Sequence, residues 1–309
     1  MSSAVAPPRL PRYRRAAGEV PLLLTERDLN ILARVESHRL ASSDQLRHLV
    51  QGSGQQILRR LQKLYHAGYL DRIRPQPVKG GGSTPMVYAI ANRGVRALLE
   101  AGRLQDASQT DWSAKNRSLH DLSVAHALLV SQVRTVVELA SAARPNFRLP
   151  LWREGRDLYD AAEVVLAEGY RRIPVAPDAY FALENAKGRM HFFLEADRGT
   201  MTLKRFVLKL KAYAAFFRER RHQEKFSIRF FRVLTVTTSA VRKRNLVSAA
   251  RAEDDVRALG RMFLFTDETA LSVAHPERVL GSIWTTAQGE DASLVLGSSG
   301  VPNDPERRG

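Results

Sequence analysis

The sequence predicts a mixed α/β protein built from two domains, and three observations support this fold class. The chain has 309 residues, which suits about two domains at roughly 100 to 200 residues each. Its first hundred residues show apolar side chains at helical spacing together with one pair of short strand-like segments. Beyond residue 118, helical and strand-like segments alternate, as they do in an α/β layer domain.

The N-terminal part predicts three helices. Thr25 and Asp28 form a variant of the capping box at the start of the first, and apolar residues follow at helical spacing. A second, short helix begins at Ser42 or Ser43. The third lies within "GSGQQILRRLQKLYHAGYL" and ends at Gly68, a residue type that often terminates helices.

A hairpin and a closing helix follow these three helices. The segments "YLDRIRP" and "PMVYAIA" predict two short strands around the glycine-rich "QPVKGGGST", and "NRGVRALLEAG" predicts a helix capped by Asn92. Together these are the elements of a winged helix-turn-helix. We expect this domain over residues 20–102, after a basic disordered arm at 1–19 and before a linker at 103–117.

Residues 118–285 predict the second domain. A long amphipathic helix over about 119–143 precedes three strands, a helix, a strand, a helix and a last strand. The second and third strands are "RRIPVAPDAYFAL" and "MHFFLEADR". Over residues 286–309 the composition turns to Gly, Ser, Pro and Asp, which predicts a disordered tail.

Charge is the strongest global signal in the sequence. The chain holds 48 Lys and Arg against 32 Asp and Glu, a net charge of +16. Residues 1–100 contain 16 basic and 7 acidic residues, and residues 198–244 contain 14 basic and 2 acidic ones. Two basic regions favour a polyanionic partner, nucleic acid before a membrane. A proteome that is simply rich in arginine is the alternative explanation.

Several classes of protein are disfavoured. Cysteine is absent, which excludes disulfides, a thiolate nucleophile and a Cys-based zinc site. We find no apolar run near the roughly 20 residues of a spanning helix, and the first residues lack the apolar core of a secretory signal. No G-x-x-x-x-G-K-[ST] loop is present, which argues against a helicase or ATPase. We therefore expect a soluble, cytoplasmic protein without a membrane partner.

The third predicted helix offers side chains that can read duplex DNA. In a helix-turn-helix this helix enters the major groove. There Gln binds adenine and Arg binds guanine in a bidentate manner, while Lys mostly holds phosphate. A lysine in the glycine-rich wing adds a contact with the DNA backbone or the minor groove. The predicted DNA-binding residues are Gln55, Gln56, Arg59, Arg60, Lys63 and Lys79.

The alternative is that the domain binds protein and that Arg59 and Lys63 belong to an ordinary solvated face. The net charge, the glutamines and the basic wing together favour double-stranded DNA as the partner.

Three carboxylates lie at the ends of predicted strands in the second domain. Asp178 begins "DAYFAL", while Glu195 and Asp197 are two residues apart in "FFLEADRGT" and so share one face of a strand. Carboxylates hold Mg²⁺ beside substrate phosphates, and such a metal activates water for phosphodiester cleavage. The candidate catalytic residues are Asp178, Glu195, Asp197 and Lys209, and the candidate Mg²⁺ ligands are Asp178 and Glu195.

The same carboxylates also have a structural explanation. Glu195 or Asp197 can pair with Arg198, Arg205 or Lys209, or cap the helix that follows. Such an ion-pair network needs no metal. The residues alone therefore leave catalysis open.

At these residues the sequence resembles known families. Pro177-Asp178 and then Glu195, in a helix-strand-strand-strand-helix-strand order, resemble the core of PD-(D/E)XK nucleases. The nuclease pattern has Lys two residues after Glu195, where this chain has Asp197, so Lys209 or Lys204 would have to substitute. Residues 20–285 resemble the replication-relaxation family of plasmids and actinobacterial mobile elements, in "LTERDLNIL", "RRLQKLYHAGYLDR", "VYAIANRG", "APDAYFAL", "FFLEADRGT" and "KLKAY".

The family resemblance implies DNA binding in the replication, relaxation or transfer of plasmid DNA. Three functions follow from it and from the residues: a DNA-binding accessory protein, a Mg²⁺-dependent endonuclease or nickase, and a transcriptional repressor. The His-x-His metal site of a tyrosine relaxase is absent. Other replication or relaxosome proteins and a second copy of this chain are further candidate partners.

Overall fold

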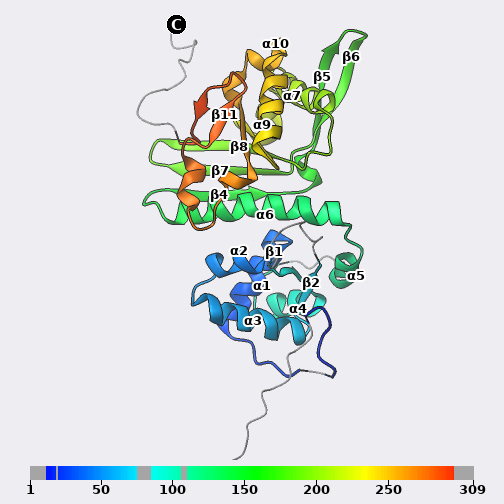
Figure 1. Ribbon diagram of the computed structural model, residues 1–309, viewed down its shortest axis with the longest axis vertical. Coiled ribbons are helices and arrows are strands. Elements are labelled where there is room, and N and C mark those ends of the chain that lie inside the picture. The colour runs from blue at the N-terminus through cyan, green and yellow to red at the C-terminus, as the bar shows by residue number, and fades with distance from the viewer. Residues whose placement is uncertain (1–11, 19, 75–84, 106–109, 296–309) are drawn as a thin grey trace, which may run out of the picture. The chain divides into compact units, whose positions relative to one another are not determined.

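The computed structural model describes residues 12–18, 20–74, 85–105 and 110–295 (Figure 1). The chain divides into two compact units, residues 1–131 and 132–309. Helices and strands alternate along it, and the largest sheet contains both parallel and antiparallel pairs. The predicted mixed α/β class is therefore confirmed.

Unit 1 contains the predicted series of three helices, a hairpin and a closing helix. Thr25 caps α1, and its side chain and that of Asp28 exchange hydrogen bonds with each other's main-chain amides, so the capping box is confirmed. Ser42 and Gln45 form the same motif at α2. The elements are α1 (Glu26–His38), β1 (Ala41–Ser42), α2 (Ser43–Leu49), α3 (Gly54–His66), β2 (Leu70–Ile73), β3 (Val87–Ile90), α4 (Asn92–Glu100) and α5 (Trp112–Arg117).

The three strands of unit 1 form an antiparallel sheet in the order β1-β3-β2. Buried apolar residues of α1, α3, α4 and the sheet share one core. The cap predicted for α4 was wrong, because Ala91 occupies the N-cap position. Asn92 is instead the first helical residue. Its side-chain amide nitrogen donates to the Asp111 carboxylate at 2.8 Å, which links α4 to the start of α5.

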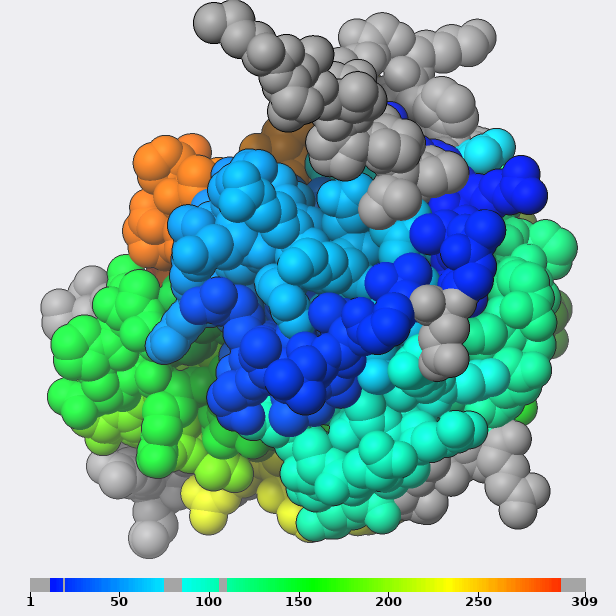
Figure 2. All heavy atoms as spheres, turned by 90° about the horizontal axis from the view of Figure 1, so that it is seen from below, coloured from blue at the N-terminus to red at the C-terminus, as the bar shows by residue number. Residues whose placement is uncertain are grey.

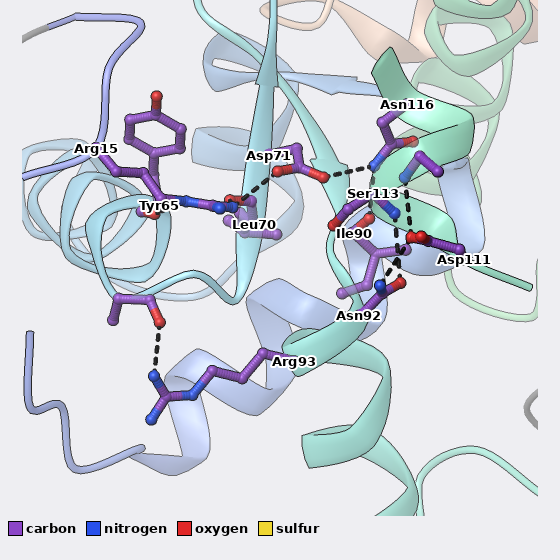
Figure 3. A network of polar contacts seen from close by, with 12 residues as sticks. Arg15, Tyr65, Leu70, Asp71, Ile90, Asn92, Arg93, Asp111, Ser113 and Asn116 are labelled. Atoms are coloured by element: carbon purple, nitrogen blue, oxygen red, sulfur yellow. Dashed lines mark hydrogen bonds and ion pairs between the residues drawn. The ribbon is translucent and has the colours of Figure 1, made fainter. Parts of the chain in front are cut away.

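Asp71 of β2 anchors two segments that the sequence did not predict to be ordered (Figure 3). One carboxylate oxygen accepts a hydrogen bond from Arg15 at 2.7 Å, and the other accepts one from Asn116 of α5 at 2.9 Å. Arg15 also donates to main-chain carbonyls at the end of α3 and in β2. Residues 12–18 of the predicted arm therefore pack on unit 1, and a helix lies inside the predicted linker.

Helix α6 (Asp121–Ala142) confirms the predicted long helix. The sequence was expected to hold no apolar run of the length that spans a membrane, and α6 departs from that expectation. Within the described residues it is the one helix long and apolar enough, by length and composition, to cross a membrane. Core helices of soluble proteins pass the same test, and 44% of its most apolar window is buried inside the fold. Val124 packs with Leu40 and Val87, which is the behaviour of a core helix.

Unit 2 is built on a seven-stranded sheet with the order β12-β11-β10-β9-β8-β7-β4. Strands β8, β9 and β10 are parallel, and the other neighbours are antiparallel. Helices α7 and α9 connect the parallel strands and pack against each other. The elements are β4 (Arg148–Arg153), β7 (Ala179–Asn185), β8 (Gly188–Asp197), α7 (Leu203–Arg218), α8 (Arg221–Phe226), β9 (Arg232–Thr237), α9 (Ala240–Arg251), α10 (Asp254–Arg257), β10 (Phe263–Asp267), β11 (Trp284–Thr286) and β12 (Asp291–Ala292).

A separate hairpin, β5 (Asp160–Leu166) and β6 (Gly169–Val175), packs against α7 and projects beside it in Figure 1. Strand β5 was not predicted from the sequence, and β6 and β7 were predicted as one continuous strand. The chain breaks between them at residues 176–178, where Pro177 lacks the amide that a ladder requires.

The start of the predicted disordered tail was also wrong. Residues 286–295, which were assigned to it, complete β11, form β12 and bury Leu294. Short polar segments of this kind resemble a frayed end by composition alone.

Candidate functional site

Helix α3 presents one exposed polar surface in unit 1. Ser53 caps the helix, its hydroxyl accepting from the Gln56 amide at 3.3 Å, while Ile57, Leu61 and Leu64 are buried in the core. Figure 2 looks onto this part of the molecule, with α3 in light blue. The exposed side chains are Gln55, Gln56, Arg59, Gln62 and Lys63, of which Gln62 was not among the predicted residues.

Arg60, which was predicted to face outward and bind DNA, instead pairs with a buried carboxylate of unit 1. Its guanidinium forms two hydrogen bonds with the carboxylate of Asp28, one of them from Nε at 2.6 Å. Asp28 is completely buried, and Arg60 is only partly exposed. The pair links α3 to the N-terminal cap of α1, so the Arg60 guanidinium holds the two helices together, and a contact of Arg60 with a base stays a prediction.

Three other cations on or beside α3 have no acidic partner among the described residues. Among the described residues, neither Arg59 nor Lys63 forms an ion pair, and the same holds for Arg27 of α1, whose guanidinium lies against Gly52. An uncompensated cluster of this kind attracts phosphate. Lys79, the sixth predicted DNA-binding residue, lies outside the described residues.

In unit 2, Glu195 lies at the centre of a polar cluster within the sheet. It is 3% exposed. Its Oε2 accepts a hydrogen bond from Lys209 of α7, and its Oε1 accepts one from the Tyr213 hydroxyl at 2.5 Å. Lys209 and Tyr213 are four residues apart and so point the same way from the helix.

Asp178 lies near this pair, at the start of β7. Its carboxylate accepts a hydrogen bond from the Ala196 amide of β8 at 2.7 Å. Its main-chain amide donates to the Leu194 carbonyl at 2.9 Å, so Asp178 lies beside the residue that precedes Glu195. Its negative charge contributes to raising the pKa of both Glu195 and Lys209. The structure thus brings together three of the four predicted catalytic residues.

Burial raises the pKa of Glu195 to about 7, against the opposing effect of the Lys209 ammonium. Burial lowers the pKa of Lys209, but the carboxylates of Glu195 and Asp178 outweigh it and the net shift is upward. The first shift favours a neutral carboxyl and the second a charged pair. Burial determines the state of the pair, because Glu195 is almost completely enclosed whereas the Lys209 side chain is 22% exposed, so the Glu195 carboxyl is held toward its neutral form.

Asp197 belongs to a separate ion-pair group at the end of β8. Its carboxylate accepts hydrogen bonds from the Thr237 hydroxyl at 2.7 Å and from Arg242 at 2.9 and 3.2 Å. Arg242 also donates to the Met201 carbonyl at 2.7 Å, which fixes the start of α9 beside the loop before α7. These contacts match the structural explanation for Asp197 and leave a catalytic role as a prediction.

The carboxylates do not fit a metal in this arrangement. Among the described residues, no three His, Cys, Asp or Glu side chains gather as metal ligands. Both oxygens of Glu195 already accept hydrogen bonds, and the Lys209 ammonium lies where a cation would have to bind. A Mg²⁺ ion would need Lys209 to move away, so we derive no chemistry through a metal here.

The basic segment 198–244 is largely compensated in the folded chain. Seven of its fourteen Lys and Arg side chains form ion pairs, most of them with acids from other parts of unit 2. Lys204, Arg205 and Arg244 are exposed and have no acidic partner among the described residues. The charge excess along the sequence therefore overstates the charge that unit 2 offers to a polyanion.

The residues that hold these clusters were not predicted from the sequence. Tyr213 follows Lys209 by four residues, so both side chains leave α7 on the same face. Because Lys209 was already predicted to lie beside Glu195, this spacing is the signal that could have identified Tyr213 as well. Thr237 and Arg242 become neighbours of Asp197 only through the parallel register of β8 and β9. Thr235, next to Glu195 in that register, has a buried hydroxyl with no hydrogen-bond partner among the described residues.

Comparison with known proteins identifies a family for this chain. A family described as replication-relaxation matches residues 32–228, which is more than half of the chain and includes α3, Asp178 and the Glu195 cluster. No curated protein and no solved structure matches.

Proposed function

Because the chain belongs to the replication-relaxation family, we propose that it is a DNA-binding accessory protein in the replication or relaxation of plasmid or other mobile-element DNA. It binds duplex DNA and does not cut it. The family supports the biological setting, and the exposed surface of α3 supports the contact with DNA. A cytoplasmic location follows from this role.

One observation carries the proposal, namely the uncompensated cations of α3 beside exposed amides. Arg59 and Lys63 have no acidic partner among the described residues, and Gln55 and Gln56 are exposed near the start of the helix. Cations of this kind hold phosphates, and amides and guanidinium groups read base edges. Arg60 is not counted among these cations, because Asp28 holds it.

We infer that unit 1 acts as a winged helix-turn-helix with α3 as the recognition helix. The order α1, α2, α3, β2, β3 supports this inference. In the major groove, Gln55 and Gln56 would lie nearest the bases and Lys63 nearest a phosphate. The exposed Lys204, Arg205 and Arg244 of unit 2 would hold flanking DNA, a smaller contribution than the segment charge suggested.

The test compares two exposed arginines of unit 1. Arg59→Ala removes a cation from α3, and Arg96→Ala removes one from α4. We expect Arg59→Ala to weaken duplex binding by about five- to a hundredfold, the range of one base contact. Arg96→Ala should bind as the unchanged protein does in fluorescence anisotropy. Equal effects of the two substitutions, or no binding of duplex DNA at all, would overturn the proposal.

An endonuclease is the second candidate, because Asp178, Glu195 and Lys209 come together as the nuclease resemblance requires. Against it, both oxygens of Glu195 are occupied by the chain's own donors. We therefore expect supercoiled plasmid to remain intact with Mg²⁺ under conditions where it is bound. Cleavage that Glu195→Gln abolishes would establish the nuclease instead.

A further inference from the structure

Tyr159 of unit 2 leaves an aromatic ring open to solvent. It lies between the 3₁₀ helix η1 (Arg156–Leu158) and strand β5, and it is 49% exposed. Within the described part of the chain, no other aromatic ring packs against it. A single exposed aromatic residue needs no explanation by itself, so the groups around Tyr159 determine whether it can serve a partner.

Lys225 of α8 links Tyr159 to a second aromatic residue. Its ammonium donates a hydrogen bond to the Tyr159 carbonyl oxygen and lies 5.8 Å from the centre of the Phe226 ring. Phe226 is half-buried, and its ring centre lies 4.9 Å from that of Tyr180 in the core. The exposed ring of Tyr159 therefore belongs to a surface on which a lysine and two aromatic residues lie together.

The acidic residues on either side of Tyr159 are each paired with an arginine. Asp157 pairs with Arg153, and Asp160 pairs with Arg221 at 2.5 Å. These pairs reduce the repulsion that either carboxylate would exert on an anion near the ring. The charge of this surface therefore comes from the cations that have no such partner.

Two cations beside Tyr159 are uncompensated. The Tyr159 amide donates to the Arg156 carbonyl at 3.0 Å, so Arg156 lies one turn before Tyr159. Arg156 and Lys225 are exposed, and neither forms an ion pair with an acid that the structure describes. Glu224 precedes Lys225, but consecutive residues of a helix do not face each other. A negatively charged partner would meet an excess of positive charge here.

These residue types suit an unpaired nucleic-acid strand. Bases of any kind stack on an aromatic ring, and cations beside the ring hold the backbone phosphates. In a duplex the bases are stacked inside the helix, so their faces do not reach a protein surface unless a nucleotide is turned out. An exposed ring flanked by Arg156 and Lys225 therefore favours single-stranded over double-stranded DNA.

We propose that Tyr159, Arg156 and Lys225 form a binding site for an unpaired DNA strand, in which one base stacks on the Tyr159 ring and the two cations hold the flanking phosphates. The inference goes beyond the proposed function, which assigns duplex DNA to α3 of unit 1. Replication and relaxation both separate the strands of DNA locally, so an unpaired strand is available where this protein is proposed to act.

An oligothymidylate of about ten nucleotides tests the site, since a single-strand site covers roughly 4 to 16 nucleotides and thymine does not pair with itself. Fluorescence anisotropy measures its affinity for the full chain, and the same proteins are titrated with duplex DNA. In a second oligonucleotide, iodouracil replaces thymine and cross-links under ultraviolet light to an aromatic residue stacked on it. We expect mass spectrometry to locate this cross-link at Tyr159.

Substitutions of two exposed tyrosines separate stacking from general contact. Tyr159→Leu removes the ring, Tyr159→Phe keeps it, and Tyr170→Leu is the matched control, because Tyr170 is 79% exposed in the hairpin β5–β6. We expect Tyr159→Leu to weaken oligothymidylate binding by about 5- to 150-fold, the range of one stacked base. Tyr159→Phe and Tyr170→Leu should bind nearly as the unchanged protein does.

Lys225→Gln tests the phosphate contact, and its control is Lys187→Gln, which changes an exposed lysine in the turn between β7 and β8. One phosphate contact contributes about 0.7 to the slope of log affinity against log salt for a single strand. Lys225→Gln should therefore reduce the magnitude of that slope by about 0.7, and Lys187→Gln should leave it unchanged. Thermal unfolding checks that each variant folds.

The inference is overturned if oligothymidylate does not bind, or if Tyr159→Leu and Tyr170→Leu weaken its binding equally. It is also overturned if Tyr159→Leu weakens duplex binding as much as single-strand binding, because the ring would then not hold an unpaired base. Each result is separable from failure of the proposed function, which is measured by duplex binding that depends on Arg59 of α3.

Discussion

At the scale of single residues, Asp28 shows how a buried charge is held. Burial raises the pKa of its carboxyl group, but hydrogen bonds from Arg60 and Thr25 outweigh burial and the net shift is downward. The carboxylate therefore stays ionised. It accepts hydrogen bonds from the Thr25 amide, the Thr25 hydroxyl and the Arg60 guanidinium. Removing its charge leaves Arg60 without an anionic partner between the packed helices of unit 1.

Asp28→Asn should destabilise the protein by about 3 kcal/mol, the lower end of the cost of breaking a buried ion pair, because the Arg60 side chain keeps some exposure. Asp44→Asn is the matched control, because Asp44 pairs with Arg47 at 3.8 Å on the exposed surface and should cost under about 1 kcal/mol. Denaturant unfolding measures both. Equal losses would show that the Asp28–Arg60 pair contributes no more than a surface contact.

Glu195 gives the second residue-scale prediction. A carboxyl whose pKa is raised on folding, here from 4.5 to about 7, binds a proton in the folded state over a range where the unfolded chain has lost it. Its contribution to stability is complete below about pH 4.5 and is lost as the pH rises through about 7. The unchanged protein should therefore lose stability relative to Glu195→Gln across this range, by on the order of 3 kcal/mol at most.

Urea unfolding of both proteins at several pH values measures this difference. A difference that does not depend on pH would mean that Glu195 is ionised throughout and that the pair with Lys209 governs its state. Lys209→Met provides the control, because loss of the ammonium should raise the pKa of Glu195 further.

At the scale of elements, Gly94 determines how closely α4 packs on the sheet of unit 1. A Cβ at this position would lie 2.3 Å from the Tyr69 carbonyl oxygen and 2.6 Å from Ile90. Alanine is favoured over glycine within a helix by about 1 kcal/mol, but it would force α4 away from β2 and β3.

Gly94→Ala should therefore destabilise the protein by about 1 to 3 kcal/mol despite the gain in helix propensity. Arg96→Ala, on the exposed side of the same helix, should change stability by less than about 0.5 kcal/mol. Thermal unfolding monitored by circular dichroism compares them. A stabilised Gly94→Ala variant would show that propensity outweighs this close packing.

Local signals predicted the elements of this fold well. Caps such as Thr25–Asp28 and apolar spacing in α3 lie within a few residues of each other, so the sequence reports them directly. The hairpin β5–β6, the break before β7 and the ordered β11–β12 were missed. Each depends on packing with distant parts of unit 2, and composition carries no such information.

The candidate sites follow the same rule: the residue types were predicted from local signals, but their contacts with distant parts of the chain were not. Asp178, Glu195 and Lys209 were named from strand ends and a resemblance, and the structure brings them together. Arg59 and Arg60 are adjacent and chemically identical, yet only one faces solvent, because the helical position of Arg60 points it at Asp28. The residue type alone does not distinguish Arg59 from Arg60, because the difference depends on Asp28 of α1, which packs beside α3.

At the scale of the whole molecule, net charge alone is a poor guide to DNA binding. The chain carries +16, but half of the basic side chains in residues 198–244 form ion pairs with acids. Lys63 of α3 and Lys211 of α7 illustrate the difference. Lys211 lies 3.3 Å from Glu253, whereas Lys63 has no acidic partner among the described residues.

Lys63→Gln and Lys211→Gln change the net charge equally, so they separate local from global electrostatics. Each phosphate neutralised by the protein contributes about 0.9 to the slope of log affinity against log salt for duplex DNA. We expect Lys63→Gln to reduce the magnitude of this slope by about 1 and Lys211→Gln to leave it nearly unchanged. Anisotropy titrations of one duplex between about 50 and 200 mM salt, the range over which such contacts weaken most visibly, measure both slopes. Equal reductions would mean that the total charge of the chain drives association. They would contradict the proposal that the exposed surface of α3 contacts the DNA phosphates.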